Sequence, residues 1–240
     1  MATRSALVVL LTLVACGRAP AVPSDPQPVA VVEDVPDEPT AGGSGGLAPP
    51  RSRRPDPTIG QPAPGFTLKD TSGAEVSLAA LRGKVVVLEW FNPQCPFVNH
   101  AHTEGPLQDL PMRWANAGVE WLPINSAGPG MEGWSVTANV DAATTWDLPR
   151  PVLLDPTGEV GRLYNARATP TIAVIDTNGL LRYLGALDNA PLGKVPSGSV
   201  YLDWTDGAIN AVIAGRDPNP IATRAWGCAV KYATPVPTGR

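Results

Sequence analysis

The sequence lacks the features that mark several large classes of protein. Its 240 residues carry 18 basic and 22 acidic side chains, so it has no basic excess of the kind that binds nucleic acid. It contains no internal repeat and no glycine-rich phosphate-binding loop. The apolar run from Ala6 to Ala15 is shorter than the ~20 apolar residues that a membrane-spanning helix needs. We therefore expect no nucleic-acid partner, and the apolar run does not predict a transmembrane helix.

Cysteine is scarce as well. The chain has three cysteines, Cys16, Cys95 and Cys228. Many redox enzymes carry a second cysteine three residues after the first, but the residue at that distance from Cys95 is Val98. Disulfide shuttling by a Cys-x-x-Cys pair that begins at Cys95 is therefore excluded, and any partner for Cys95 must lie far along the chain.

The N-terminus resembles an export signal. Arg4 precedes the apolar run, and small residues follow it, as in a secretory signal peptide. The segment Leu13-Val14-Ala15-Cys16 also resembles a bacterial lipobox, in which the chain is cut before a cysteine that carries lipid. In the alternative, an ordinary signal peptide is cleaved and Cys16 is incidental. We expect residues 1–15 to be removed, and the protein to be exported and anchored through Cys16 to a bacterial membrane, facing the periplasm or cell envelope.

Export from the cytoplasm would affect the state of the remaining cysteines. Lipidation of Cys16 leaves Cys95 and Cys228 as the two thiols, and disulfides persist outside the cytoplasm. We therefore predict a disulfide between them, provided that their Cα atoms approach within ~7 Å. The sequence leaves open whether this bond is redox-active or a structural staple.

Composition divides the rest of the chain. Residues 17–57 contain ten prolines and five glycines, a proportion typical of low-complexity sequence. Residues 16–57 are thus expected to form a disordered tether that holds a domain away from a surface. Residues 58–232 have a globular composition and are expected to form one domain, followed by a tail at 233–240.

The apolar pattern of the domain alternates between two periods. Near-continuous apolar runs predict buried strands, and apolar residues at helical spacing predict helices between them. The expected strands are residues 84–91, 119–124, 151–154, 171–176 and 180–185, and the expected helices lie within 96–117, 140–147, 158–164 and 204–214. This order, ending in a hairpin and a helix, predicts an α/β fold with a central mixed sheet flanked by helices.

Several motifs resemble one family. The first are Ala63-Pro64, Phe66, Asp70, Gly73 and Leu81-Arg82-Gly83-Lys84, which lead into the apolar run before Cys95. The second group is ATPTIAVID at residues 168–176, followed by Asn-Gly and LRYLGALD. Together they resemble a thioredoxin-like redoxin of the alkyl hydroperoxide reductase and thiol-specific antioxidant group, here in lipoprotein form. The resemblance covers roughly residues 58–232 and implies a thioredoxin-like fold.

The surroundings of Cys95 indicate a reactive thiol. Cys95 follows a predicted buried strand, and Pro96 suits the first turn of a helix because no N–H is needed there. A cysteine that caps a helix N-terminus lies near the positive end of the helix dipole, which favours the thiolate. The alternative is a buried, inert cysteine.

The resemblance assigns further roles. It implies that Thr169 and Pro170 form a cis-proline loop that faces the cysteine and pairs with an extended substrate, as in strand addition. We therefore expect Thr169, Pro170 and Pro96 to contact substrate, although Pro170 in an ordinary loop is the alternative. Glu89, six residues before Cys95, lies in an apolar run where a carboxylate is costly. By resemblance it is the buried acid that helps to move the cysteine's proton; alternatively, it lies at a sheet edge and pairs with a lysine.

Two features of the sequence argue against peroxidase activity and against metal binding. Peroxidases of this group carry Thr or Ser three residues before the reactive cysteine and a proline earlier, but this chain has Asn92 and Leu88 there. Pro170 also falls where their arginine is expected. His100 and His102 lie two residues apart, so on a helix they point ~200° apart and cannot share one ion. We expect weak peroxidase activity at best, no metal site and no cofactor.

The sequence thus predicts an extracytoplasmic thiol-disulfide oxidoreductase of thioredoxin fold. Cys95 is the expected nucleophile, Cys228 its distant resolving partner, and a protein thiol or disulfide the expected substrate. One alternative is a peroxiredoxin-like hydroperoxide reductase acting on a small peroxide. The other is a non-catalytic binding module in which the two cysteines form a structural staple.

Overall fold

The computed structural model describes residues 57–233. The predicted signal peptide, the lipidated Cys16, nearly all of the tether and all but the first residue of the tail lie outside the described residues. These features therefore stay predictions. Within residues 57–233, no helix is long and apolar enough to cross a membrane.

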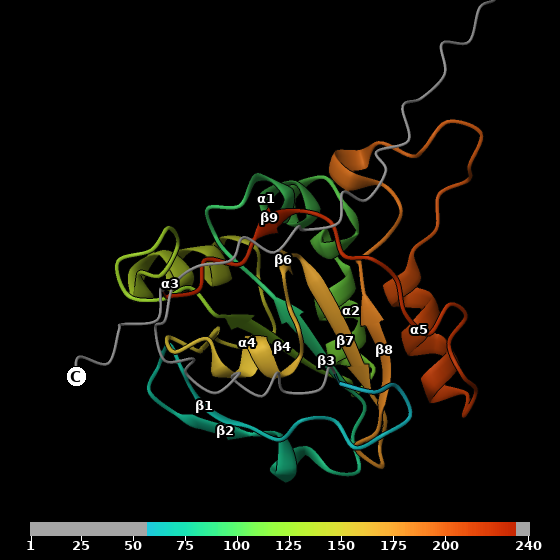
Figure 1. The fold of residues 1–240 in the computed structure, drawn as a ribbon, viewed down its shortest axis with the longest axis horizontal. Helices are drawn as coiled ribbons and strands as arrows, with labels where there is room; N and C mark the ends of the chain where they lie inside the picture. The colour runs from blue at the N-terminus through green and yellow to red at the C-terminus, as the bar shows by residue number, and fades with distance from the viewer. Residues whose placement is uncertain (1–56, 234–240) are drawn as a thin grey trace, which may run out of the picture. The chain divides into compact units, whose positions relative to one another are not determined.

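A seven-stranded mixed sheet forms the centre of the domain (Figure 1). Its strands are β1 (Thr67–Asp70), β2 (Glu75–Ser77), β3 (Val86–Trp90), β4 (Glu120–Asn125), β5 (Leu153–Leu154), β7 (Thr171–Ile175) and β8 (Leu181–Gly185). They lie in the order β2-β1-β5-β4-β3-β7-β8. Strands β3, β4 and β5 run parallel, and the remaining neighbours pair antiparallel. The predicted central mixed sheet is confirmed.

Helices cover both faces of this sheet. They are α1 (Pro96–Thr103), α2 (Leu110–Asn116), α3 (Val136–Thr145), α4 (Glu159–Leu163) and α5 (Trp204–Ile213), with short 3₁₀ turns η1 (Leu78–Leu81), η2 (Pro106–Gln108) and η3 (Pro191–Gly193). Because side chains alternate along a strand, Leu88 of β3 packs with Val160 of α4, whereas Val87 packs on the other face with Ile209 of α5. The central strand is therefore buried on both sides.

The structure also contains strands that the apolar pattern did not predict. β1 and β2 form a short, partly exposed hairpin at one end of the sheet order. β6 (Ala168–Thr169) and β9 (Cys228–Ala229) form a separate two-stranded sheet. In Figure 1, β9 lies beside α1 and β6, so the last described residues return to the region where Cys95 begins α1.

Candidate active site

The loop after β3 places Cys95 at the start of α1. Cys95 is the N-cap residue, with an extended backbone (φ −79°, ψ 121°), and Pro96 occupies the first turn as the sequence predicted. Asn92 shapes the loop, because its Oδ1 accepts a 2.9 Å bond from the backbone N–H of Gln94 and its Nδ2 donates to the Glu132 carbonyl at 3.0 Å. The Cys95 side chain is only 3% exposed.

Cys95 is joined to Cys228 by a disulfide. The two residues are 133 positions apart in sequence, and their Cα atoms lie 6.0 Å apart, within the limit for a bridge. The pairing predicted from the sequence is therefore present. Unlike Cys95, Cys228 is only partly buried.

The proline loop faces this disulfide. The Thr169–Pro170 peptide bond is cis, in agreement with the resemblance, and the Thr169 carbonyl oxygen lies 3.4 Å from Cys95 Sγ. Thr169 pairs with Cys228 in the β6–β9 ladder, and Ala168 pairs with Ala229. The backbone edge at which we expected an extended substrate is thus occupied by the chain's own C-terminal segment.

Contacts on both sides of Cys228 hold that segment. Before it, the Trp226 indole N–H donates a 2.7 Å bond to the Asp188 carbonyl. After it, the Val230 N–H donates to the Arg167 carbonyl at 3.0 Å, and the Tyr232 hydroxyl donates to the Ala166 carbonyl at 2.6 Å. These bonds fix the position of β9 independently of the disulfide.

Gly227 permits the closest approach in this segment. Its φ is +127°, a value that side-chain-bearing residues rarely adopt. A Cβ atom at this position would collide with the Thr169 carbonyl oxygen. Glycine is therefore required immediately before Cys228 if β9 is to pair with β6.

Glu89 lies in the interior rather than at a sheet edge. It is fully buried in β3, between β4 and β7, so the alternative of an edge carboxylate paired with lysine is wrong. Its Oε1 lies 2.8 Å from His102 Nε2, and its Oε2 accepts a 2.8 Å bond from the Trp121 indole N–H. These partners satisfy a carboxylate that would otherwise be costly to bury.

His102 links Glu89 to the packing around Cys95. Its ring stacks on Trp146, with centroids 4.6 Å apart, and Trp146 meets Phe91 edge to face at 5.5 Å. Phe91, Trp146, Cys95 and Cys228 belong to one apolar cluster. From the sequence, His102 was considered only as a metal ligand, and that role was rejected. The available signal for the pairing of Glu89 with His102 was a polar residue within a predicted buried strand, followed by a second one in the next predicted helix.

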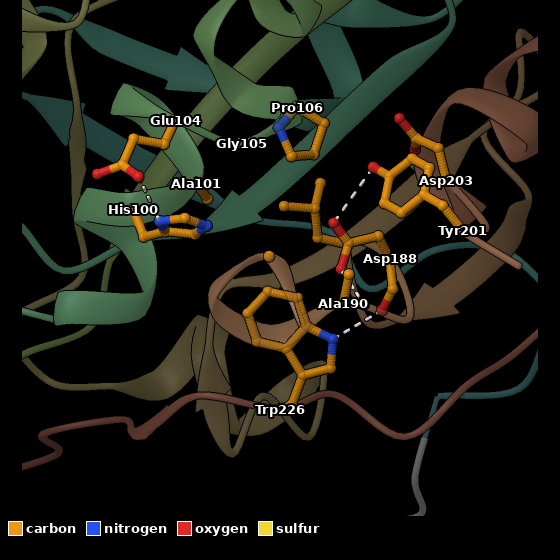
Figure 2. A pocket seen from close by; sticks show the side chains of 12 residues that line it. His100, Ala101, Glu104, Gly105, Pro106, Asp188, Ala190, Tyr201, Asp203 and Trp226 are labelled. Carbon is orange, nitrogen blue, oxygen red and sulfur yellow. Dashed lines mark hydrogen bonds and ion pairs between the residues drawn. The ribbon is translucent and has the colours of Figure 1, made fainter. Parts of the chain in front are cut away.

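His100 lies on another side of α1, in a pocket next to Trp226 (Figure 2). This pocket has a volume of about 340 Å³ and is also lined by Asp188, Tyr201 and Asp203. Burial raises the pKa of Asp203 to about 6, and repulsion by Asp206 and Asp188 adds to this effect. Burial also raises the pKa of Asp188. Sequence reasoning missed this pocket because residues from α1, the segment after β8 and the C-terminal segment build it together.

The arrangement is suited to thiol chemistry. A disulfide at a helix N-terminus yields a stabilised thiolate when it opens, and the adjacent cis-proline loop supplies backbone groups beside it. Asn92, which stands where peroxidases carry Thr or Ser, uses both polar ends of its side chain in bonds to the backbone of Gln94 and Glu132. Within residues 57–233, no three His, Cys, Asp or Glu side chains are grouped as metal ligands would be.

Comparisons with known proteins agree with this chemistry. Residues 59–184 match the family model described as the AhpC/TSA family. The chain is 30% identical over 126 residues to the thiol-disulfide oxidoreductase ResA of Geobacillus thermodenitrificans, covering 52% of this chain and 67% of that protein. It is also 30% identical over 124 residues to the thioredoxin-like protein YneN of Bacillus subtilis, covering 51% of this chain and 68% of the relative.

Solved structures match more of the chain. An uncharacterized conserved protein from Geobacillus kaustophilus superposes with a TM-score of 0.64 at 27% identity, covering 75% of this chain and 94% of that one. A hypothetical protein from Sinorhizobium meliloti 1021 shares the fold, with a TM-score of 0.61 at 24% identity over 73% of this chain and 95% of the other. The family match itself ends at residue 184 and does not reach Cys228.

Proposed function

This chain belongs to the AhpC/TSA family, and we propose that it is a thiol-disulfide oxidoreductase that works through the Cys95–Cys228 couple. The observation that carries the proposal is the position of this disulfide, which joins the N-cap of α1 to a strand paired with the cis-proline loop. The relatives named thiol-disulfide oxidoreductase support the same reaction class.

The reaction is an exchange of two electrons between two thiol-disulfide pairs. The oxidised protein takes two electrons from a substrate dithiol, so that the substrate gains a disulfide while Cys95 and Cys228 become thiols. The reverse reaction reduces a substrate disulfide. The substrate class is a protein carrying thiols or a disulfide.

Neighbouring residues position this couple. Pro96 begins the helix whose dipole stabilises the Cys95 thiolate. The carbonyl oxygen of Thr169, which precedes the cis Pro170, lies 3.4 Å from Cys95 Sγ. Glu89 is the buried acid of the site. Its hydrogen-bond partners are His102 and Trp121 rather than Cys95. We therefore propose that it acts through His102, which lies in α1, the helix that Cys95 caps.

We further propose that the reaction takes place outside the cytoplasm. The export signal and the lipobox support a protein anchored through Cys16. Intact mass and membrane fractionation test this proposal. A soluble mature chain that begins at a residue other than Cys16 would contradict it.

The exchange reaction can be measured with a reduced peptide that contains two cysteines. We expect the oxidised protein to convert the peptide to its disulfide, and Cys95→Ser and Cys228→Ser to abolish this conversion. A Cys95–Cys228 bond that resists millimolar dithiothreitol in the folded protein would instead indicate a structural staple. Hydrogen peroxide turnover comparable to that of a dedicated peroxiredoxin would favour the hydroperoxide reductase alternative.

A further inference from the structure

The two cysteines of the disulfide differ in their exposure to solvent. Cys95 is 3% exposed and packs in an apolar cluster with Phe91, Val98 and Val152. Cys228 lies at the margin of that cluster and is partly exposed. Its neighbours Gly227 and Ala229 are both exposed and have either no side chain or a single methyl group. Cys228 is therefore the more accessible of the two residues.

The direction of attack makes this difference decisive. A thiolate attacks a disulfide along the axis of the bond that breaks, from the side opposite the leaving sulfur. Cys95 lies within a buried apolar cluster, whereas Cys228 is partly exposed, so Cys228 is the residue that an external thiolate reaches more readily. Exchange rates depend on which sulfur is accessible and on how good the leaving thiolate is.

The leaving sulfur favours the same direction. When an external thiolate attacks Cys228, the sulfur released is that of Cys95, at the N-cap of the eight-residue helix α1. The first turn of α1 contains no acidic side chain that would oppose a negative charge. A helix N-terminus stabilises a thiolate, and this effect favours Cys95 as the leaving group, whereas its apolar surroundings oppose the charge.

We propose that Cys228 is the cysteine at which external thiols exchange, and that Cys95 is the buried partner that leaves and returns. This inference rests on the proposed function. The external thiolate forms a bond to Cys228 Sγ, the Cys95–Cys228 bond breaks, and Cys95 departs as a thiolate. The second thiolate of the substrate then attacks the substrate sulfur of the mixed disulfide. This step forms the substrate disulfide and releases Cys228 as a thiolate. This order exchanges the roles that the sequence indicated.

The C-terminal segment supports this cycle because its attachment does not depend on the disulfide. Trp226 and Tyr232 hold it on either side of Cys228, and the β6–β9 ladder holds Cys228 opposite Thr169. A mixed disulfide at Cys228 therefore stays within reach of the Cys95 thiolate. In the reverse direction, that thiolate attacks Cys228 Sγ and expels the substrate.

The first experiment maps the mixed disulfide directly. The oxidised full chain carrying Cys16→Ser is mixed with glutathione, quenched with acid after a short time, alkylated with N-ethylmaleimide and digested for mass spectrometry. We expect glutathione on Cys228 and the maleimide on Cys95. Glutathione on Cys95 at the earliest times would overturn this inference but leave the proposed function standing. The absence of any exchange would overturn both.

The second experiment measures each sulfur alone. In the Cys16→Ser background, Cys95→Ser leaves Cys228 free, and Cys228→Ser leaves Cys95 free. We expect Cys228 to react with 5,5′-dithiobis(2-nitrobenzoate) at least about tenfold faster than Cys95 in the folded proteins, because buried cysteines are protected. The difference should vanish in denaturant, which controls for intrinsic reactivity. A Cys95 that reacts as fast as Cys228 in the folded state would contradict the inference.

Discussion

The part of the chain that matches the family, residues 59–184, and the part that follows it, residues 185–233, contribute differently to the site. The first supplies six of the seven sheet strands and all but the last residue of β8, together with Cys95, Glu89 and the cis-proline loop. The second supplies α5, the strand β9 and Cys228. One cysteine thus lies in the family scaffold, and its partner lies beyond the match.

This difference shows how the chain has a redox pair without Cys-x-x-Cys spacing. Val98 stands where a nearby partner would be, is fully buried, and packs in the same cluster as Cys95. The second sulfur instead comes from a strand that pairs with the proline loop. The following predictions test how far the two parts depend on each other, beginning with the largest expected effect.

Cutting the covalent link is expected to have the largest effect. Cys228→Ser removes a bond that closes a loop of 133 positions, and loss of this constraint should lower the free energy of unfolding by about 5 kcal/mol on a chain-entropy basis. Urea unfolding without reductant measures the change. Wild-type protein unfolded with reductant should approach the value of the variant. A variant as stable as the oxidised protein would contradict the prediction.

Breaking the buried pair within the scaffold should rank second. Glu89→Leu leaves two buried groups without their partner, the Trp121 indole N–H and His102 Nε2, and each such group typically costs about 1 to 3 kcal/mol. The double variant Glu89→Leu, His102→Leu should lose less. Glu75→Leu, at an exposed position of β2, serves as the control and should change little. Urea unfolding distinguishes the three.

The close contact between the two parts, at Gly227 and Thr169, can be tested by substitution of Gly227. Gly227→Ala combines strain at φ +127° with a collision against the Thr169 carbonyl, and should cost about 2 to 3 kcal/mol. Gly198→Ala is the matched control, because Gly198 has φ +76° and open space around its Cα, so about 1 kcal/mol of strain is expected. Equal losses in the two variants would show that the close approach at Thr169 is not required.

The smallest expected effect is a pH dependence in the C-terminal part. The pKa of Asp203 is raised by burial to about 6, so the folded state binds its proton more tightly than the unfolded state does. As pH rises from about 4 to 7, wild type should lose about 1 to 2 kcal/mol relative to Asp203→Asn, after allowance for solvent screening. Asparagine also caps helices well, so α5 keeps its N-cap. Parallel pH profiles of the two proteins would contradict the prediction.

Much of the scaffold was predictable because long apolar runs carry a clear period. The run at 84–91 contains β3, and the helical spacing at 204–214 contains α5. β6 and β9 have two residues each, too few to show alternation, and their pairing depends on a contact between distant segments. The sequence therefore predicted the bond between Cys95 and Cys228, but not that Cys228 would lie in a strand.

In the site, too, contacts between distant segments were not predictable. Cys95 and Pro96 were predicted from local helix chemistry, and the pairing with Cys228 from the small number of thiols. The relative exposure of the two cysteines was not predictable, because it depends on packing by α3 and the segment at Val152. The Glu89–His102 pair was missed because their contact joins a strand and a helix across the core.

The position of Cys228 also makes the bridge a late event in synthesis. Ribosomes make a chain from its N-terminus, so Cys95 is made 133 positions before Cys228. No other cysteine lies between them, and lipidation of Cys16 would prevent that residue from pairing with Cys95 in the meantime. A chain that stops before residue 228 cannot close the bridge, so premature termination and a missing disulfide coincide.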